Sequence, residues 1–243
     1  MQSNNIALKN AFGDPVSLRK ETTNNDLMTV QGTANKTGVL LLLCMLTAAI
    51  SWNMPALAFP FMIVGGLSGL VIAIALAFKP QWAMFGGPVY ALLQGLSMGA
   101  ISAIFNAAYP GIVFQAVGIS FGVLAVMLVA YTSGLVRATE KFKMGVIVAT
   151  GGIMLFYIGS MIMGFFGFQN PAMQSGLIGI AFSLFVVVIA ALNLVLDFAM
   201  IEESADRGAP QYMEWYGAFA LMVTLVWLYL EILRLLSKLR SRD

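Results

Sequence analysis

The chain has 243 residues, of which 60% are hydrophobic and only 10% are charged, and its mean hydropathy is +0.87. Ordinary soluble domains carry roughly 25% charged residues, so a soluble domain of this length could not cover its surface with so few polar side chains. The net charge of +2 and the lack of a basic patch interleaved with aromatic residues exclude a nucleic-acid-binding protein. We therefore expect an all-α integral membrane protein surrounded by the lipid bilayer.

Histidine is absent from the sequence, and Cys44 is the single cysteine. This composition excludes histidine-based metal sites, Ser-His and Cys-His nucleophilic pairs, and a disulfide within the chain. Any proton sensing must then fall to carboxylates. We expect no enzymatic activity and no resident cofactor.

Two regions follow from the distribution of polarity along the chain. Residues 1–36 are polar and show no helical or strand periodicity, so we expect a flexible tail. Residues 37–243 are expected to form a bundle of seven transmembrane helices that ends in a short basic C-terminal tail. The predicted apolar segments are Thr37–Trp52, Phe59–Phe78, Pro88–Ala108, Ile112–Gly134, Met144–Phe168, Gly176–Met200 and Trp215–Leu236.

The basic residues of the loops predict the orientation. Those on the N-terminal side of the seven spans are Lys79, Arg137, Lys141, Lys143 and Arg207, and the three opposite loops hold no Lys or Arg. Cytoplasmic loops carry an excess of basic residues, so we expect a cytoplasmic N-terminus. The basic residues between Arg234 and Arg242 would then lie outside, against this rule, unless the last helix re-enters the membrane.

Small residues at four-residue spacing predict where helices approach closely. These pairs are Gly65 and Gly69, Gly95 and Gly99, Gly118 and Gly122, and Ser160 and Gly164. We interpret them as packing positions.

Polar residues also recur on single helix faces inside the spans. Tyr90, Gln94 and Ser97 follow i, i+4, i+7 spacing in the third span, and Asn193 and Asp197 follow i, i+4 spacing in the sixth. Such groups need partners in hydrocarbon, so these faces should point into the bundle or a wet cavity. Tyr90, Gln94 and Asn193 are therefore candidate pore-lining residues, with hydrogen bonding between helices as the alternative.

The intramembrane acids are the most informative residues. Asp197 lies about 7.5 Å along a helix from Glu202, the first acid that looks like a water-facing boundary, and an interfacial position is the alternative. Glu231 lies about 25 Å beyond Glu214, towards the far end of the seventh helix. Arg234 follows Glu231 at i+3, so a local ion pair is the alternative there.

Several stretches resemble the Bax inhibitor superfamily, in particular its bacterial membrane branch. They are "MTVQGTANKTGVLLLL" (28–43), "GPVYALLQGLSMGAISAIFNAAYPGIVFQAV" (87–117), "LDFAMIEESADRGAPQYMEWYGAF" (196–219) and "LYLEILRLLSKL" (228–239). The resemblance covers about residues 27 to 240 in order. It implies seven helices with the last one surrounded by the others, a location in a bacterial cytoplasmic (inner) membrane, and no known enzymatic chemistry.

The resemblance also implies a function, a pH-sensitive calcium leak in which a hydrogen-bonded pair of acids from the sixth and seventh helices closes a pore. Asp197 in "LDFAMIE" matches the sixth-helix aspartate, although Phe198 and Ala199 replace the Thr-Gln that often follows it. Glu231 in "LYLE" resembles the Leu-Tyr-Leu-Asp of the seventh helix. Gln94 stands where relatives often carry glutamate, and an amide cannot titrate.

An acid pair of this kind would serve as gate and calcium site together. Two touching carboxylates cannot both ionise cheaply, so one keeps its proton. Losing that proton would push the helices apart and leave carboxylate oxygens suited to calcium. Asp197 and Glu231 would then bind the calcium ion transiently. For straight helices, however, the two acids differ in depth by ~15 Å, and Glu214 is the alternative partner.

A second hypothesis comes from a different class of protein. Some bacterial relatives bind and restrain a membrane-embedded AAA protease, so the chain is alternatively an interaction protein that modulates such a protease. Deleting residues 2–26 should leave ion flux intact under the first hypothesis and abolish partner binding under a tail-mediated form of the second.

Overall fold

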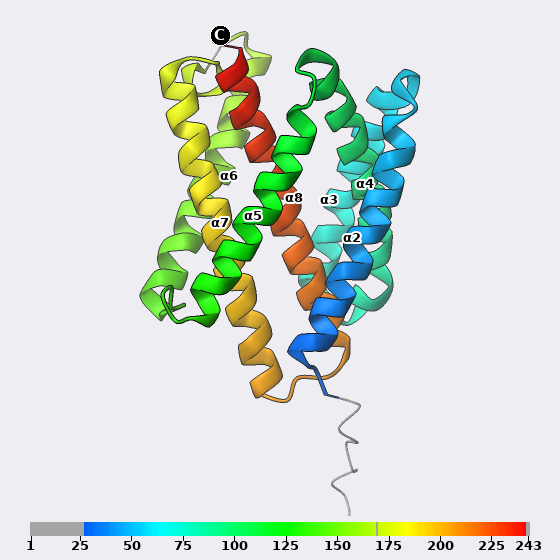
Figure 1. The fold of residues 1–243 in the computed structure, drawn as a ribbon, viewed down its shortest axis with the longest axis vertical. Helices are drawn as coiled ribbons and strands as arrows, with labels where there is room; N and C mark the ends of the chain where they lie inside the picture. The colour runs from blue at the N-terminus through cyan, green and yellow to red at the C-terminus, as the bar shows by residue number, and fades with distance from the viewer. Residues whose placement is uncertain (1–26, 169, 242–243) are drawn as a thin grey trace, which may run out of the picture.

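A computed structural model describes residues 27–168 and 170–241. In this part of the chain, seven helices are long and apolar enough to cross a membrane, which confirms the predicted seven-helix architecture (Figure 1). They are α2 (Val30–Trp52), α3 (Ala58–Phe78), α4 (Ala83–Ala108), α5 (Ile112–Thr132), α6 (Glu140–Phe165), α7 (Leu177–Asp206) and α8 (Tyr212–Arg240).

The helix ends follow from local sequence. Thr29 and Thr139 cap α2 and α6, each accepting a hydrogen bond from a backbone N–H in the first turn. Three short 3₁₀ helices begin with proline, whose fixed φ suits a first turn; they are η2 (Pro55–Leu57), η3 (Pro80–Trp82) and η4 (Pro171–Met173). Gly208, at φ 67°, turns the chain between α7 and α8 in a conformation that a side chain would strain.

The last helix occupies the middle of the bundle, as predicted. α8 packs against α2, α4, α5 and α7, and it is the most buried of the seven spans, whereas α6 is the least buried. Residues of α8 contribute to both large hydrophobic clusters, with Leu228 and Met222 fully buried. In Figure 1, α8 runs behind the gap between α2 and α5.

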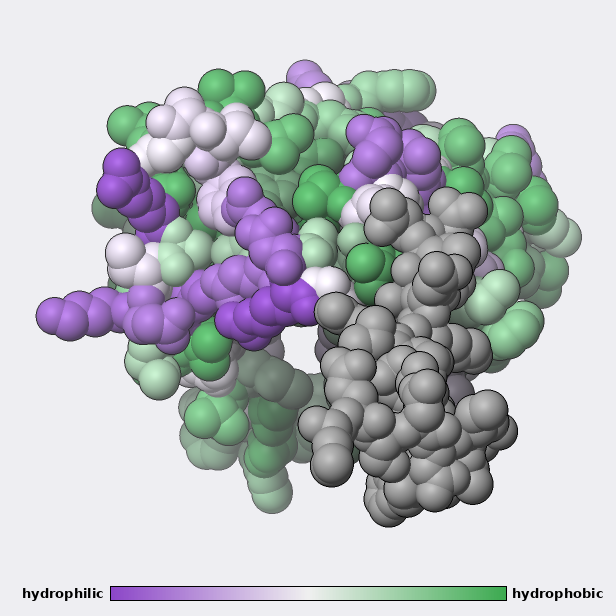
Figure 2. Space-filling view, turned by 90° about the horizontal axis from the view of Figure 1, so that it is seen from below, coloured by the Kyte–Doolittle hydropathy of each residue, from purple (hydrophilic) through white to green (hydrophobic). Residues whose placement is uncertain are grey.

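The two ends of the bundle differ in polarity. We call the end that carries the start of α2 and the α7–α8 turn the N-terminal face, and the end that carries the last turn of α8 the C-terminal face (Figure 1). Hydrophilic residues gather on the N-terminal face, seen from below in Figure 2. Glu140, Lys143, Glu203 and Arg207 form ion pairs there.

The helices extend beyond the predicted apolar segments at both ends of the chain. α2 begins at Val30 rather than Thr37, so the last part of the predicted tail is helical; residues 1–26 of that tail lie outside the described residues. α8 continues to Arg240, so the predicted basic C-terminal tail is largely helix. Both extensions consist of polar turns, which hydropathy alone does not assign to a helix.

The C-terminal cations have structural roles. Lys238 is buried and donates to Ala172 O at 2.9 Å, Gly179 O at 3.0 Å and Ser183 Oγ at 2.9 Å. Arg240 donates to Pro110 O and to Gln115 Oε1. Hydrogen bonds to the bundle therefore account for two of the basic residues that conflict with the charge rule.

The small-residue prediction holds for two of the four pairs. A Cβ at Gly65 would lie 2.5 Å from Leu93 O of α4, and a Cβ at Gly95 would lie 2.2 Å from Cys44 O of α2. These glycines let α4 approach α3 and α2 closely. Gly118 and Gly122 have no such neighbour within 4 Å, so α5 does not use its pair for packing within the described bundle.

Candidate functional site

Asp197 is the acid whose environment stands out. It lies in α7, about 14 Å before the end of the helix at Asp206. The Thr224 side chain of α8 is a polar neighbour of the carboxyl group. The carboxyl oxygen Oδ2 is buried, and it is the one buried side-chain polar atom among the described residues that lacks a hydrogen-bond partner. Nearly all buried polar groups are paired, so an unpaired carboxylate oxygen inside a membrane helix marks a candidate functional site.

The acids nearer the N-terminal face are paired. Tyr131 of α5 donates to Glu202, and Lys143 of α6 forms an ion pair with Glu203. Glu202 therefore belongs to the polar rim of the bundle, and Asp197 lies about a turn and a half deeper on the same helix. Asp197 therefore does not lie at the interface, which was the alternative expectation, because the polar rim begins closer to the N-terminal face, at Glu202.

A polar cavity of about 450 Å³ opens at this rim. It lies between the end of α5, the α5–α6 loop and the last turns of α7, and its charged lining residues are Arg137, Glu202, Glu203 and Asp206. Lys143 and Arg207 balance Glu203. Glu202 and Asp206 form no ion pair in the described chain, and neither does Arg137, so the mouth carries charges of both signs.

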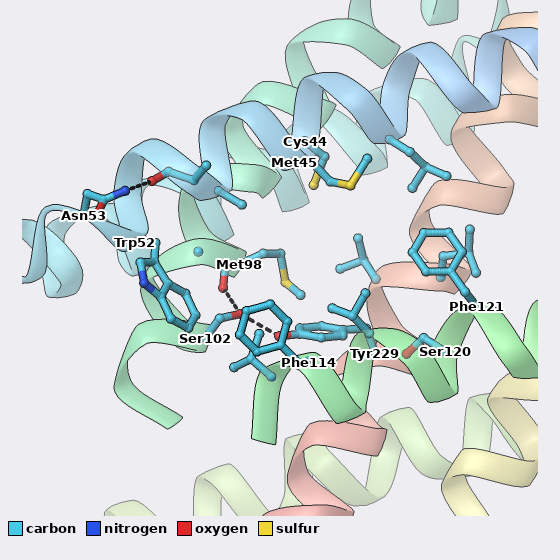
Figure 3. Close-up of a pocket in the computed structure, with 18 residues that line it drawn as sticks. Cys44, Met45, Trp52, Asn53, Met98, Ser102, Phe114, Ser120, Phe121 and Tyr229 are labelled. Carbon is cyan, nitrogen blue, oxygen red and sulfur yellow. Dashed lines mark hydrogen bonds between the residues drawn. The ribbon is translucent and has the colours of Figure 1, made fainter. Parts of the chain in front are cut away.

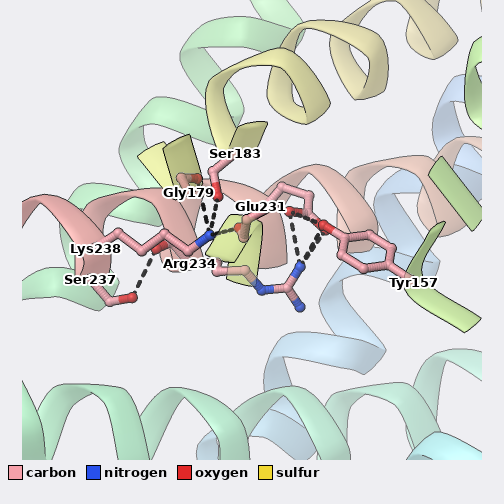
Figure 4. A network of polar contacts seen from close by, with 8 residues as sticks. Tyr157, Gly179, Ser183, Glu231, Arg234, Ser237 and Lys238 are labelled. Atoms are coloured by element: carbon pink, nitrogen blue, oxygen red, sulfur yellow. Dashed lines mark hydrogen bonds and ion pairs between the residues drawn. The ribbon is translucent and has the colours of Figure 1, made fainter. Parts of the chain in front are cut away.

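Glu231 has a different environment. Its side chain is 2% exposed, and Arg234 Nη1 donates to its two carboxylate oxygens at 2.9 and 3.1 Å. The Tyr157 hydroxyl of α6 lies 2.9 Å from both oxygens and accepts a hydrogen bond from Arg234 at 2.7 Å (Figure 4). The carboxylate is therefore neutralised by a cation one turn away, as the local ion-pair alternative predicted.

The structure does not bring Asp197 and Glu231 together, so the predicted acid pair is wrong for this conformation. Thr224, which faces Asp197, precedes Glu231 by about two helical turns, or ~10 Å along α8. The cause is the position of the α7–α8 turn, which places the two acids at unequal depths. A depth mismatch in the direction calculated from the sequence therefore remains, at ~10 Å.

Glu214, the alternative partner, is also engaged elsewhere. It is 3% exposed, forms an ion pair with Lys36 of α2, and accepts hydrogen bonds at Oε1 from the backbone and hydroxyl of Thr29, both at 2.8 Å. A Cβ at Gly32 would lie 2.1 Å from this carboxylate, so only glycine leaves room for it. Glu214 therefore ties the start of α8 to the start of α2 and does not reach Asp197.

The three candidate pore-lining residues lie in helix interfaces. Tyr90 is buried, with its ring 5.0 Å from that of Phe219, and Gln94 faces Gly69 of α3. Asn193 donates to Thr150 Oγ1 of α6 and to its own-helix Ile189 O, both at 2.8 Å. The alternative of hydrogen bonding and packing between helices describes all three better than a shared pore lining.

Ser97, in the same α4 stripe, is the centre of a Gly95-x-Ser97-x-Gly99 sequence. This pattern marks the nucleophile of α/β-hydrolases only when the serine sits on a turn between a strand and a helix. Here Ser97 lies inside α4 and donates to Met62 O at 3.3 Å. Gly95 and Gly99 contact α2 closely, so the pattern is a packing feature.

No group of three or more Cys, Asp or Glu residues in the described chain is arranged to hold a metal ion. Asp197 and Glu231 do not form the predicted shared calcium site, because Arg234 already occupies the carboxylate of Glu231.

Sequence reasoning missed the partners of the acids. Tyr157 and Thr224 are uncharged residues within apolar runs, and Lys36 lies where the sequence predicted a tail. One signal was present for Tyr157, which is a polar tip inside a membrane segment that needs a partner. Which acid it would meet depends on the packing of α6 against α8.

Comparisons with known proteins agree with the resemblance. A family model described as Bax inhibitor 1 like matches residues 6–241. A search among curated proteins found no match to the chain.

Proposed function

The chain belongs to the Bax inhibitor 1 like family, and from this premise we propose that it is a pH-sensitive leak for calcium or a similar cation, controlled by Asp197. The observation that carries the proposal is the buried, unpartnered Oδ2 atom of Asp197. Of the three candidate acids, Glu214 and Glu231 have cationic partners, whereas Asp197 forms no ion pair among the described residues.

Protonation of Asp197 would hold the leak closed. A neutral carboxyl group is tolerated between α7 and α8, where it can donate to or accept from Thr224. An ionised carboxyl group there has no cation to compensate its desolvation, so it must draw in water or a cation, or separate the helices around it. We therefore expect flux to rise as pH rises and Asp197 loses its proton, and to fall as pH falls.

The polar mouth on the N-terminal face supports this assignment. Glu202 and Asp206 line the polar cavity that lies about a turn and a half from Asp197. With Arg137 they give the cavity a charged lining that would bring water and ions close to the gate. The excess of basic loop residues on this face supports a cytoplasmic N-terminus.

The test is calcium entry into proteoliposomes that carry the purified protein, measured at pH 6, 7 and 8. Wild type is compared with Asp197→Asn, which keeps the shape of the side chain but cannot ionise. We expect wild-type flux to increase with pH and the variant to show low flux without pH dependence. Glu231→Gln is the matched control, because Glu231 already has Arg234; it should keep the pH dependence.

Two results would contradict the proposal. Wild-type flux no higher than in empty liposomes at every pH would exclude the leak. A pH dependence that survives in Asp197→Asn would exclude Asp197 as the controlling acid. In the first case the protease-modulator hypothesis, which rests on the family resemblance, becomes the one to pursue by crosslinking in native membranes.

A further inference from the structure

A second cavity lies on the other side of α8, away from the acids. It has a volume of about 450 Å³ and is enclosed by α2, α4, α5 and α8 (Figure 3). Its walls are mostly hydrophobic side chains, including Met45, Met98, Phe114 and Phe121. Its volume falls within the ~300–1,000 Å³ range of sites that hold small apolar ligands.

The cavity faces the hydrocarbon of the bilayer through the gap between α2 and α5. Both helices pack against α4 and α8, but they do not pack against each other in the described bundle. The side chains at this opening are exposed on the lipid-facing surface of the protein, with Phe114 79% exposed and Met45 49% exposed. Leu225, Val226 and Tyr229 of α8 line the side of the cavity that faces the middle of the bundle.

The hydroxyl groups in the wall already have partners. The Ser102 and Tyr229 hydroxyls lie 2.7 Å apart, as Figure 3 shows, and Ser102 also donates to Met98 O. Ser120 donates to Ala116 O, and Asn53 donates to Ala49 O. A water molecule needs two to four polar partners to occupy a cavity, so this one favours an apolar occupant.

The cavity also has the length of one leaflet. Its α2 wall runs from Leu41 to Asn53, about 18 Å at 1.5 Å per residue. Half of a hydrocarbon core ~30 Å thick is ~15 Å. Trp52 lies at the end near the C-terminal face, where an indole ring suits the membrane–water interface. The cavity thus extends from the level of the headgroups towards the bilayer centre.

We propose that this cavity binds one acyl chain of a phospholipid from the leaflet at the C-terminal face. The chain enters sideways between α2 and α5 and lies against α8, with its headgroup near Trp52 at the interface. Apolar walls, an opening onto hydrocarbon, satisfied polar groups and a leaflet-long wall favour an acyl chain over water or a polar ligand. This proposal is independent of the cation leak.

The test uses a phospholipid that carries a photoactivatable diazirine in its acyl chain, reconstituted with the full-length protein in liposomes. After irradiation, the labelled peptides are identified by mass spectrometry. We expect labelling to concentrate on cavity-lining residues of α4, α5 and α8. Val117→Trp places an indole ring at the opening and should reduce that labelling several-fold. Val126→Trp, at an exposed position of the same helix outside the cavity, should leave it unchanged.

A second readout distinguishes an acyl chain from water. Cys44 is buried in the cavity wall and is the single cysteine of the chain. Its reaction with a thiol reagent therefore shows whether that reagent can enter the cavity. We expect it to resist a membrane-impermeant, charged thiol reagent in folded protein and to react after unfolding.

Three results would overturn the proposal. Labelling in the cavity no stronger than on the exposed faces of α3 or α6, and unaffected by Val117→Trp, would indicate ordinary lipid contact. Rapid reaction of Cys44 with the charged reagent would indicate a water-filled cavity. Absence of lipid adducts in the cavity, together with crosslinks between protein copies at α2 and α5 formed by a separate bifunctional reagent, would indicate that a second copy covers the opening. Thermal unfolding of both tryptophan variants verifies that they fold.

Discussion

Arg234 donates from Nη1 to both carboxylate oxygens of Glu231, one turn earlier on α8, at 2.9 and 3.1 Å. The Glu231 side chain is 2% exposed and the Arg234 side chain 38% exposed. Glu231 therefore needs its partner to compensate its charge more than Arg234 does. Water or headgroups can solvate Arg234 alone, whereas Glu231 alone would be a buried charge without compensation. The pair therefore ties α8 to α6 through Tyr157, which contacts both partners.

Replacing Arg234 by leucine is expected to lower the free energy of unfolding by about 2–3 kcal/mol, because breaking a buried ion pair leaves Glu231 uncompensated. Thermal or denaturant unfolding in detergent micelles measures the loss. Arg207→Leu is the control, since Arg207 is 78% exposed and lies 3.5 Å from Glu203; it should cost about 0–1 kcal/mol. Equal losses of unfolding free energy in the two variants would show that the Glu231–Arg234 pair stabilises the fold no more than an exposed ion pair does.

The junction of α2 and α8 gives a second prediction. Gly32→Ala places a methyl group 2.1 Å from the Glu214 carboxylate and must displace it from Lys36 and Thr29, so we expect a loss of about 1–3 kcal/mol. Gly38→Ala, in the same helix with no neighbour within 4 Å, should gain about 0.5–1 kcal/mol from helix propensity. A loss of unfolding free energy in Gly32→Ala with a gain in Gly38→Ala would support the role of Glu214 in joining α8 to α2. A gain in both variants would contradict it.

Lys238 gives a third prediction. Lys238→Met keeps most of the side-chain volume and removes the three hydrogen bonds that join α8 to Ala172, Gly179 and Ser183. We expect a loss of about 1–3 kcal/mol and faster hydrogen exchange in the first turns of α7. Lys141→Met, at an exposed position of α6, should change neither. Unchanged exchange at the start of α7 in Lys238→Met would rule out this anchoring role.

The fold was predictable because hydrocarbon imposes a simple rule on sequence. A bilayer core requires about 20 consecutive apolar residues per helix, so the number and order of the spans followed from hydropathy. The ends did not, because the turns around Val30 and Arg240 are polar and are stabilised by tertiary contacts. Thr29 caps α2 and bonds to Glu214, far along the chain, and nothing in the local sequence reports that contact.

The candidate site was predicted in part. Asp197 was identified because a carboxylate within an apolar run is expensive, and that argument needs no knowledge of packing. The pairing of the acids could not be derived in the same way, since it depends on where the α7–α8 turn falls and on which neighbours satisfy each carboxylate. Spacing alone did anticipate both the depth mismatch and the Glu231–Arg234 pair.

The unpartnered Asp197 carboxyl is the centre of the functional proposal, and its protonation can be observed directly. The decisive measurement is infrared difference spectroscopy of the carboxyl C=O band in proteoliposomes, titrated across the pH range used for calcium flux. The account predicts a protonated-carboxyl band that is absent in Asp197→Asn and disappears over the same pH interval in which flux rises. A band assigned to Asp197 that stays constant while flux changes, or flux that changes where no such band titrates, would contradict it.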